Sequence, residues 1–342
     1  MLKARAFIEA LLPNQPTALL PNHPIPSESI TMTPPLDLLR GDAAAQSAAL
    51  DQDLDALVPA VGLNRRGFVA GSLTAGFAAS VVPTGALLAQ TITTPADGLR
   101  AEAVSIPMAD GTLVPGYLAA PRTFQRTPII LVVQEIFGVH EHIRDVCRRL
   151  ARAGYCAIAP ELFFRQGDPS KIESAAEIVK TLVPRVTDAQ VMSDLDATVA
   201  FGRANGGDDS RLAITGFCWG GRITWLYAAH NPGVKAGVAW YGRLTGPSNT
   251  ATPLNPHDIA GRLHGPVLGL YGGADQGIPV STVDEMKQRL AQGNAASKAS
   301  EFVVYPDAPH AFHADYRPSY RKEAAQDAWG RAITWLRRHG LA

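Results

Sequence analysis

Short apolar runs alternate with longer segments of helical periodicity through most of the chain beyond residue 100. Runs such as Pro128–Val133 and Pro266–Tyr271 contain almost no polar positions, which is typical of strands buried on both faces of a sheet. Between such runs, apolar residues recur three or four positions apart, as over 141–153, which predicts amphipathic helices. This alternation predicts one α/β domain with a mostly parallel, doubly wound sheet and helices on both faces.

The predicted elements follow one another without an internal repeat or a second domain boundary. Strands at 101–106 and 112–119 flank Asp110-Gly111, which is a strong signal for a β-hairpin. The other predicted strands are 128–133, 155–159, 211–215, 236–241, 266–271 and 301–305. The predicted helices are 141–153, 171–183, 187–204, 222–229, 281–292 and a final helix marked by Trp329, Ala332, Ile333 and Leu336 and ended by Gly340.

The N-terminal part of the chain departs from this pattern. Residues 1–63 are rich in Pro, Ala, Asp and Ser and lack sustained periodicity, so we expect a disordered extension. Residues 64–89 pair Arg65-Arg66 with an uncharged, mildly apolar stretch, which resembles a twin-arginine signal peptide. We therefore expect partnership with the twin-arginine export machinery, a periplasmic location and a folded domain over 90–342. A membrane anchor and a chance arginine pair are the alternatives, and Met32 is an alternative start.

Composition removes several classes of function. The chain has 342 residues, 46% of them apolar, and a formal net charge of zero. Without a basic run, nucleic-acid binding is disfavoured. Three cysteines do not describe a disulfide scaffold, and we interpret Cys147 and Cys156 as apolar filler of a helix and a strand. The histidines lack metal-binding spacing and no dinucleotide or phosphate loop is present, so we expect neither metal nor cofactor.

One segment carries a strong chemical signal: Gly216-Phe217-Cys218-Trp219-Gly220-Gly221, between an apolar run and a helix-like segment. Strand, tight turn and helix form the nucleophile elbow of α/β-hydrolases, here with cysteine in place of the usual serine. Glycines two positions before and after the nucleophile let neighbouring backbone approach closely. The following helix directs N–H groups and the positive end of its dipole toward the sulfur, which favours the thiolate. A small buried cysteine between glycines is the alternative.

Two later loops supply candidate partners for Cys218. Asp275 and His310 each follow a predicted strand, in the chain order nucleophile, acid, histidine of α/β-hydrolases. Ligands bind beyond the carboxyl ends of parallel strands, so we expect these three side chains to meet there. His310 would then act as the base and Asp275 would orient its ring. Asp307 and His313 are the competing candidates.

These residues and the segments around them resemble dienelactone hydrolases (carboxymethylenebutenolidases) from about Ala101 to Leu341. The matching segments are Gln134-Glu135-Ile136-Phe137-Gly138-Val139, Pro160–Gln166, Gly216–Gly221, Gly272–Asp275 and His310–Phe312. The resemblance implies an α/β-hydrolase that opens small lactones or cleaves small carboxylic esters through an acyl-thioenzyme. We expect a monomer with a small-molecule substrate, no nucleic-acid partner and no stable membrane span in the mature protein.

The resemblance also implies roles for residues around the nucleophile. The backbone N–H groups of Ile136 and Trp219 would bind the oxyanion. Glu135 directly follows the strand at 128–133, so it lies in or beside the site. The resemblance implies that Glu135 takes the thiol proton when substrate arrives, which keeps the resting cysteine neutral and protected from oxidation. A carboxylate at the rim of the site is the alternative.

Two further positions match residues that contact substrate in the family. Arg165 would pair with a substrate carboxylate and Tyr241 would line the pocket, whereas a surface arginine and a core aromatic are the alternatives. The chain departs from the family at Ala314, where well-known members have a second arginine four positions after the histidine. This departure keeps a carboxylesterase of different substrate open, beside an acyltransferase and a non-catalytic binding protein of hydrolase fold.

Overall fold

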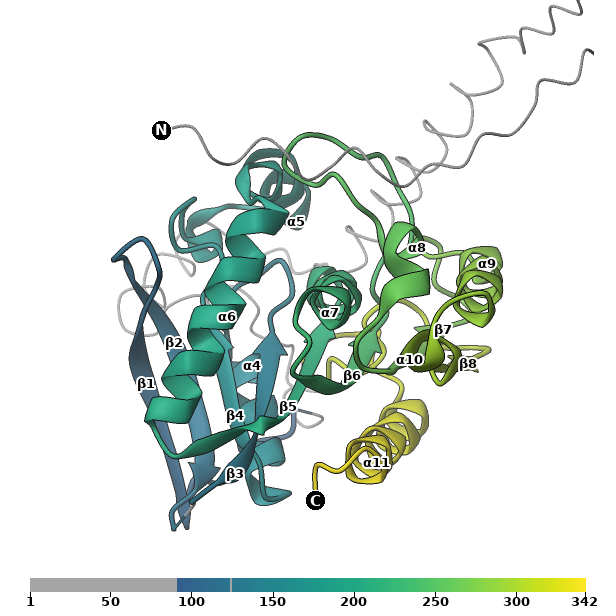
Figure 1. The fold of residues 1–342 in the computed structure, drawn as a ribbon. Coiled ribbons are helices and arrows are strands. Elements are labelled where there is room, and N and C mark those ends of the chain that lie inside the picture. Colours follow the sequence, from purple (N-terminus) through teal and green to yellow (C-terminus); the bar gives the residue numbers. More distant parts are fainter. Residues whose placement is uncertain (1–90, 124) are drawn as a thin grey trace, which may run out of the picture. The chain divides into compact units, whose positions relative to one another are not determined.

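An eight-stranded sheet organises the described part of the chain, which is residues 91–123 and 125–342 of a computed structural model. The extension expected at 1–63 and the signal peptide expected at 64–89 lie outside the described residues. The strands lie in the order β1-β2-β4-β3-β5-β6-β7-β8 (Figure 1). From β3, the chain first runs toward one edge of the sheet and then toward the other, as in doubly wound sheets.

The strands from β3 onward are parallel, and a hairpin is added at one edge. The hairpin pairs β1 (Leu99–Pro107) with β2 (Leu113–Pro121), and β2 also runs antiparallel to β4. The parallel strands are β3 (Thr127–Val133), β4 (Cys156–Pro160), β5 (Gly207–Phe217), β6 (Val234–Trp240), β7 (Val267–Gly272) and β8 (Glu301–Tyr305). The predicted α/β fold class is therefore confirmed.

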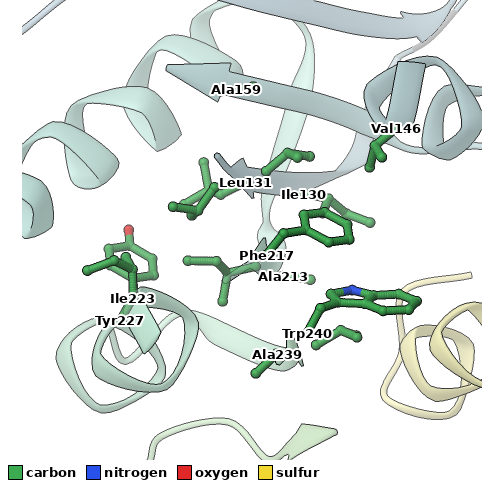
Figure 2. Close-up of a cluster of buried hydrophobic side chains, with 14 of the residues drawn as sticks. Ile130, Leu131, Val146, Ala159, Ala213, Phe217, Ile223, Tyr227, Ala239 and Trp240 are labelled. Carbon is green, nitrogen blue, oxygen red and sulfur yellow. The ribbon is translucent and has the colours of Figure 1, made fainter. Parts of the chain in front are cut away.

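Helices cover both faces of the sheet. The long ones are α4 (Glu141–Arg152), α6 (Asp188–Ala204), α7 (Trp219–His230), α9 (Val280–Ala291) and α11 (Lys322–Arg338). Shorter ones are α8 (Pro256–Ile259), η5 (Ala260–Arg262) and α10 (Ala295–Lys298). In Figure 2, Val146 of α4 lies on one side of the strands, and Ile223 and Tyr227 of α7 lie on the other. None of the helices within 91–123 and 125–342 has the length and apolar character needed to cross a membrane.

The core explains why the strand predictions succeeded. All residues of β3, β4 and β7 are buried, because helices cover both faces of these strands. Successive strand residues point to opposite faces, as Ile130 and Leu131 do in Figure 2. A strand buried on both faces must therefore be apolar at every position, and this produces the continuous apolar runs in the sequence.

The helix predicted over 171–183 is wrong in its extent. The structure has four short helical turns there: η2 (Pro169–Lys171), α5 (Ala175–Glu177), the π-helical η3 (Ile178–Leu182) and η4 (Val183–Arg185). Ser174 has an extended backbone, and its hydroxyl accepts a hydrogen bond from Glu177 N, so a new helix begins after it. Pro184 then lies at the start of η4. This broken segment brings Val179 and Val183 to the wall of a cavity.

Candidate active site

Cys218 lies on a strained turn between β5 and α7. Its φ of 54° and ψ of −114° fall outside the regions that L residues prefer. A Cβ at Gly216 would collide with Gly220 O, and a Cβ at Gly220 would lie 2.5 Å from the carbonyl oxygen of Val133. The two glycines therefore let the turn form directly against the end of β3. The structure has the local geometry of a nucleophile elbow, with Cys218 partly exposed at the N-terminus of a helix.

The structure brings Asp275 and His310 together. His310 Nδ1 lies 2.7 Å from Asp275 Oδ2, and the other carboxylate oxygen accepts hydrogen bonds from the backbone N–H groups of Gly277 and Ile278. These bonds fix the carboxylate, which in turn fixes the imidazole ring. Cys218 and His310 also interact electrostatically, and both line the same cavity. A hydrogen-bonded acid–imidazole pair thus lies in the same site as the thiol.

The electrostatic surroundings of His310 favour the imidazolium. Burial alone would lower its pKa, but the charges of Asp275 and Cys218 and the hydrogen bond to Asp275 hold the pKa of His310 well above its usual value. The competing histidine has the opposite surroundings. His313 is buried against Phe217 and Trp240, and burial holds its pKa well below the usual value.

Neither His313 nor Asp307 is among the residues that line the cavity, and the described residues place Asp275, not Asp307, beside His310.

A cavity of about 210 Å³ opens over Cys218. At about 30 Å³ per water molecule, this volume suits a small substrate. Four groups of residues line the cavity: Cys218, Trp219, Ile136 and His310 around the nucleophile; Val179 and Val183 of η3 and η4; Tyr241, Arg243, Pro247, Thr252 and Asn255 after β6; and Arg222, Gly277 and Ile278. The wall is mainly apolar with a few polar groups, as in small-molecule sites generally.

The residues expected to form the oxyanion hole come from two different segments next to Cys218. Trp219 is the first residue of α7, so its N–H group has no partner within the helix. Ile136 belongs to a tight turn after β3, which Glu161 Oε2 holds by accepting a hydrogen bond from Val139 N at 2.7 Å. Both residues line the cavity beside Cys218, as the resemblance implied.

Glu135 is buried in a cluster that the sequence did not reveal. Its carboxylate accepts a hydrogen bond from the Tyr316 hydroxyl at 2.8 Å, and lies 3.4 Å from His140 Nε2 and 3.6 Å from Arg317 Nη2. We call Glu135, His140, Tyr316 and Arg317 the carboxylate cluster. Burial alone would raise the pKa of Glu135, but Arg317 and His140 hold it well below its usual value. Glu135 is therefore an ionised carboxylate, and a rim position is wrong because only 1% of the residue is exposed.

The loop that carries Ala314 contains an arginine at position 317, which pairs with Glu135 and is not among the residues that line the cavity. Ala314 is fully buried, whereas Arg317, further along the same loop, carries its guanidinium to Glu135 and over the rings of Phe137 and Tyr316. The available signal was a Tyr-Arg pair in the loop that also carries His310. Sequence reasoning missed it because the resemblance directed attention to position 314 alone.

Arg165 does not reach the cavity. Its guanidinium binds Asp110 through Nε at 2.9 Å and Asp194 through Nη1 at 2.6 Å, and further hydrogen bonds join Nη2 to both carboxylates. Arg165 thus ties the β1–β2 hairpin turn to α6. Two other arginines line the cavity, Arg222 and Arg243, and no sequence motif singled out Arg243. Its signal was a cation just beyond the carboxyl end of β6, the strand beside β5.

Tyr241 lies where the resemblance implied. It lines the cavity, and its ring contacts that of His310 edge to face with centroids 5.2 Å apart. Its φ of 38° is unusual for a residue with a side chain, and its buried hydroxyl has no hydrogen-bond partner among the described residues. Strain and an unsatisfied hydroxyl at one residue are typical of a functional position. No group of His, Cys, Asp and Glu side chains suited to a metal ion occurs in the described ranges.

Comparisons with known proteins agree with this geometry. The sequence profile of the dienelactone hydrolase family matches residues 114–340. A Methylorubrum extorquens protein named "Putative carboxymethylenebutenolidase" is 60% identical over 295 residues, covering 86% of this chain and 99% of that protein. An Escherichia coli K12 protein of the same name is 52% identical over 266 residues, covering 78% and 96%.

A solved structure gives the same result. The crystal structure of a "Putative Dienelactone Hydrolase" from Klebsiella pneumoniae superposes with a TM-score of 0.69 at 54% identity, covering 71% of this chain and 100% of that one. Sequence profile, relatives and fold lead to one conclusion. The chain belongs to the dienelactone hydrolase family.

Proposed function

We propose that this chain hydrolyses small lactones or carboxylic esters through an acyl-thioenzyme formed on Cys218. The observation that carries the proposal is the hydrogen-bonded pair of Asp275 and His310, whose imidazole lines the same cavity as Cys218 and interacts electrostatically with it. An imidazole that is held by a carboxylate and lies in the same site as a thiol is the arrangement that activates a cysteine nucleophile. Membership of the dienelactone hydrolase family supports the same class of reaction.

The first half-reaction acylates the enzyme. The Cys218 sulfur attacks the carbonyl carbon, a C–S bond forms, and the carbonyl electron pair moves onto oxygen. The N–H groups of Ile136 and Trp219 donate to that oxygen. The carbonyl then re-forms as the C–O bond to the leaving oxygen breaks, and His310 donates its proton to the leaving alkoxide. In a lactone this alcohol stays attached to the acyl chain.

The second half-reaction returns the enzyme to its starting state. His310, now neutral, removes a proton from a water molecule as that water attacks the thioester carbon. The oxyanion forms again between the same two N–H groups and collapses with cleavage of the C–S bond. The carboxylic acid leaves, His310 again carries a proton, and the Cys218 thiolate regains from Glu135 the proton that it gave up when substrate bound.

Glu135 is the proposed acceptor of the thiol proton when substrate binds. Two observations support this role: Glu135 is ionised although buried, and it interacts electrostatically with Tyr241 and Arg317, as Cys218 does. To accept the proton, Glu135 must exchange part of its contact with the carboxylate cluster for contact with Cys218. The buried Tyr241 hydroxyl, which has no hydrogen-bond partner within the described residues, interacts electrostatically with both Glu135 and Cys218.

Acyl-enzyme trapping tests the proposal. Cys218→Ala should lower kcat by at least about 10⁴-fold, while its thermal midpoint stays within a few degrees of the wild type. His310→Gln, which lacks the deacylation base, should accumulate an adduct with the mass of the acyl group, seen by intact mass spectrometry and absent from Cys218→Ala/His310→Gln. Turnover by Cys218→Ala would place the nucleophile elsewhere. Product analysis with an added alcohol separates hydrolysis from acyl transfer.

We also propose that the chain is exported through the twin-arginine pathway. The support is Arg65-Arg66 followed by an uncharged, mildly apolar stretch. N-terminal mass spectrometry of the periplasmic fraction should find a mature chain that begins near Gln90. Replacing Arg65-Arg66 by Lys-Lys should retain the protein in the cytoplasm, and an unchanged distribution would contradict export by this route.

A further inference from the structure

The charged groups of the cavity are unbalanced. Two arginines, Arg222 and Arg243, contribute to its wall, whereas no Asp or Glu does among the described residues. Arg222 is neutralised, because its Nη1 and Nη2 bind the two carboxylate oxygens of Asp188 at 2.7 and 2.8 Å and Nη2 also donates to Leu254 O. The remaining positive charge belongs to Arg243.

Arg243 differs from Arg222 in its contacts. No hydrogen bond or ion pair joins it to any residue in 91–123 or 125–342, although its side chain is half-buried. Burial lowers the pKa of Arg243, the charge of the nearby Cys218 sulfur raises it and that of Arg222 lowers it, but a guanidinium stays protonated at neutral pH. A partly desolvated cation without a counter-ion is costly for the folded protein, and an anion that enters with the ligand would offset that cost.

The loop after β6 is shaped around this side chain. A Cβ at Gly246 would lie 3.2 Å from Cδ and 3.3 Å from Nη1 of Arg243, so the arginine extends across a glycine. Asn255, which also lines the cavity, donates to Gly246 O at 2.9 Å and fixes that part of the loop. The guanidinium is therefore held at the cavity wall by its surroundings.

The position of Arg243 also indicates how a substrate would be oriented in the cavity. In the sheet, β5 lies between β3 and β6, so Cys218 stands between Ile136 on the β3 side and Arg243 on the β6 side. Arg165, which follows β4, lies beyond β3 on the other side of the sheet and is occupied by Asp110 and Asp194. A substrate whose carbonyl oxygen points to Ile136 would extend its far end toward Arg243.

We propose that Arg243 is a specificity-determining residue that binds the carboxylate of a small anionic ester or lactone on the β6 side of Cys218. The proposal rests on the ester hydrolysis proposed above and names the substrate class of that site. A carboxylate matches the planar fork of one guanidinium, whereas a phosphate dianion would need more donors than this apolar wall offers. Val179, Val183 and Ile278 suit the hydrocarbon chain between the carbonyl and the carboxylate.

A matched pair of substrates tests the proposal kinetically. The p-nitrophenyl ester of glutarate carries a free carboxylate, and the corresponding ester of monomethyl glutarate is its neutral counterpart. Arg243→Met should lower the ratio of kcat/KM for the anionic over the neutral ester by about 10- to 100-fold. Arg243→Lys should recover part of that ratio.

Arg165→Met is the control, and it should leave the ratio of the two kcat/KM values within about twofold of the wild type. Both kcat/KM values are measured on the same enzyme, so a smaller folded fraction lowers them equally and leaves their ratio unchanged. The comparison therefore holds even if Arg165→Met is less stable. An unchanged ratio in Arg243→Met, or a fall in Arg165→Met instead, would overturn the assignment.

A binding measurement separates this inference from the proposed chemistry. Calorimetry with Cys218→Ala should detect monomethyl glutarate more tightly than its neutral dimethyl ester, and adding Arg243→Met should weaken monomethyl glutarate by about 10-fold or more. Inorganic phosphate should not compete. Binding that depends on Arg243 without hydrolysis by the wild type would refute the esterase and keep the anion site. If hydrolysis depends on Cys218 but binding of monomethyl glutarate does not depend on Arg243, the esterase proposal stands and the anion site is refuted.

Discussion

The charged groups on the two sides of Cys218 differ in their burial and in their pairing. On the β3 side, the carboxylate cluster buries Glu135 and Arg317 to 1% exposure each and satisfies them with one another, Tyr316 and His140. On the β6 side, Arg243 stands half-buried at the cavity wall, and nothing in the described ranges pairs with it. Both arginines lie near Cys218, yet only one of them is neutralised by the protein itself.

This difference separates charges that the fold requires from a charge that a ligand would require. Removing one partner of a buried pair leaves the other charge uncompensated, so loss of a single member of the carboxylate cluster should destabilise the fold. Removing an arginine that has no partner leaves nothing uncompensated. Substitutions on the two sides should therefore differ in stability, and the differences can be ranked.

The largest loss of stability is expected for Arg317→Met. It leaves the Glu135 carboxylate buried without its guanidinium, and the free energy of unfolding should fall by about 3–5 kcal/mol. Adding Glu135→Gln should recover much of that loss, because the double variant holds no isolated charge. Urea unfolding measures both. Arg338→Met is the control: it breaks an exposed pair with Glu301 and should cost less than about 1 kcal/mol. Similar losses at Arg317 and Arg338 would contradict the comparison.

A smaller loss is expected for Tyr316→Phe. The substitution removes the hydroxyl that donates to Glu135 at 2.8 Å, and a hydrogen bond to a buried charge contributes about 1.5–3 kcal/mol. Tyr305→Phe is a matched control, because Tyr305 donates over the same distance to Asp327 at an exposed position. Urea unfolding should show a clearly greater loss for Tyr316→Phe, and equal losses would mean that burial gives the first bond no added value.

Part of this site could be predicted from the sequence because its constraints are local. The turn at Cys218 needs glycine at positions 216 and 220, where backbone atoms of neighbouring segments leave no room for a Cβ. Buried strands need continuous apolar runs, so the places where Asp275 and His310 follow their strands could also be read. Both requirements leave a mark within a few residues of the feature itself.

The rest depended on partners that lie far away along the chain. The sequence around Arg165 does not show whether its guanidinium binds a substrate or protein carboxylates. Its partners, Asp110 and Asp194, belong to a hairpin and a helix that are distant along the chain. The role of Arg317 follows only from its position beside Glu135 in the folded structure. Arg243 is defined by the absence of a partner within the described residues, a property that no local pattern encodes.

The pH dependence of stability gives a further test of the β3 side. The folded-state pKa of Glu135 lies below the usual 4.5, so its ionisation contributes stability above about pH 4.5 that is lost as the pH falls through the folded-state pKa. Glu135→Gln lacks this dependence, and its unfolding free energy should fall less steeply than that of the wild type below pH 4.5. Glu173→Gln, at an exposed side chain, is the control and should follow the wild type. Parallel curves for Glu135→Gln and the wild type would show that Glu135 is not held ionised by its cluster.

The smallest effect on stability is expected for Arg243→Met, and Arg222→Met at the same cavity provides the contrast. The side chains of Arg222 and Asp188 are only 10% and 13% exposed. Arg222→Met removes the guanidinium from this pair and should lower the free energy of unfolding by about 2–4 kcal/mol. Arg243→Met breaks no interaction with a described residue, so its unfolding free energy should stay within about 1 kcal/mol of the wild type or rise slightly. Urea unfolding of both variants, with and without monomethyl glutarate, measures the contrast. Monomethyl glutarate should stabilise the wild type by mass action, because it binds only the folded protein. It should not stabilise Arg243→Met, because that variant lacks the guanidinium that binds the carboxylate of the ligand.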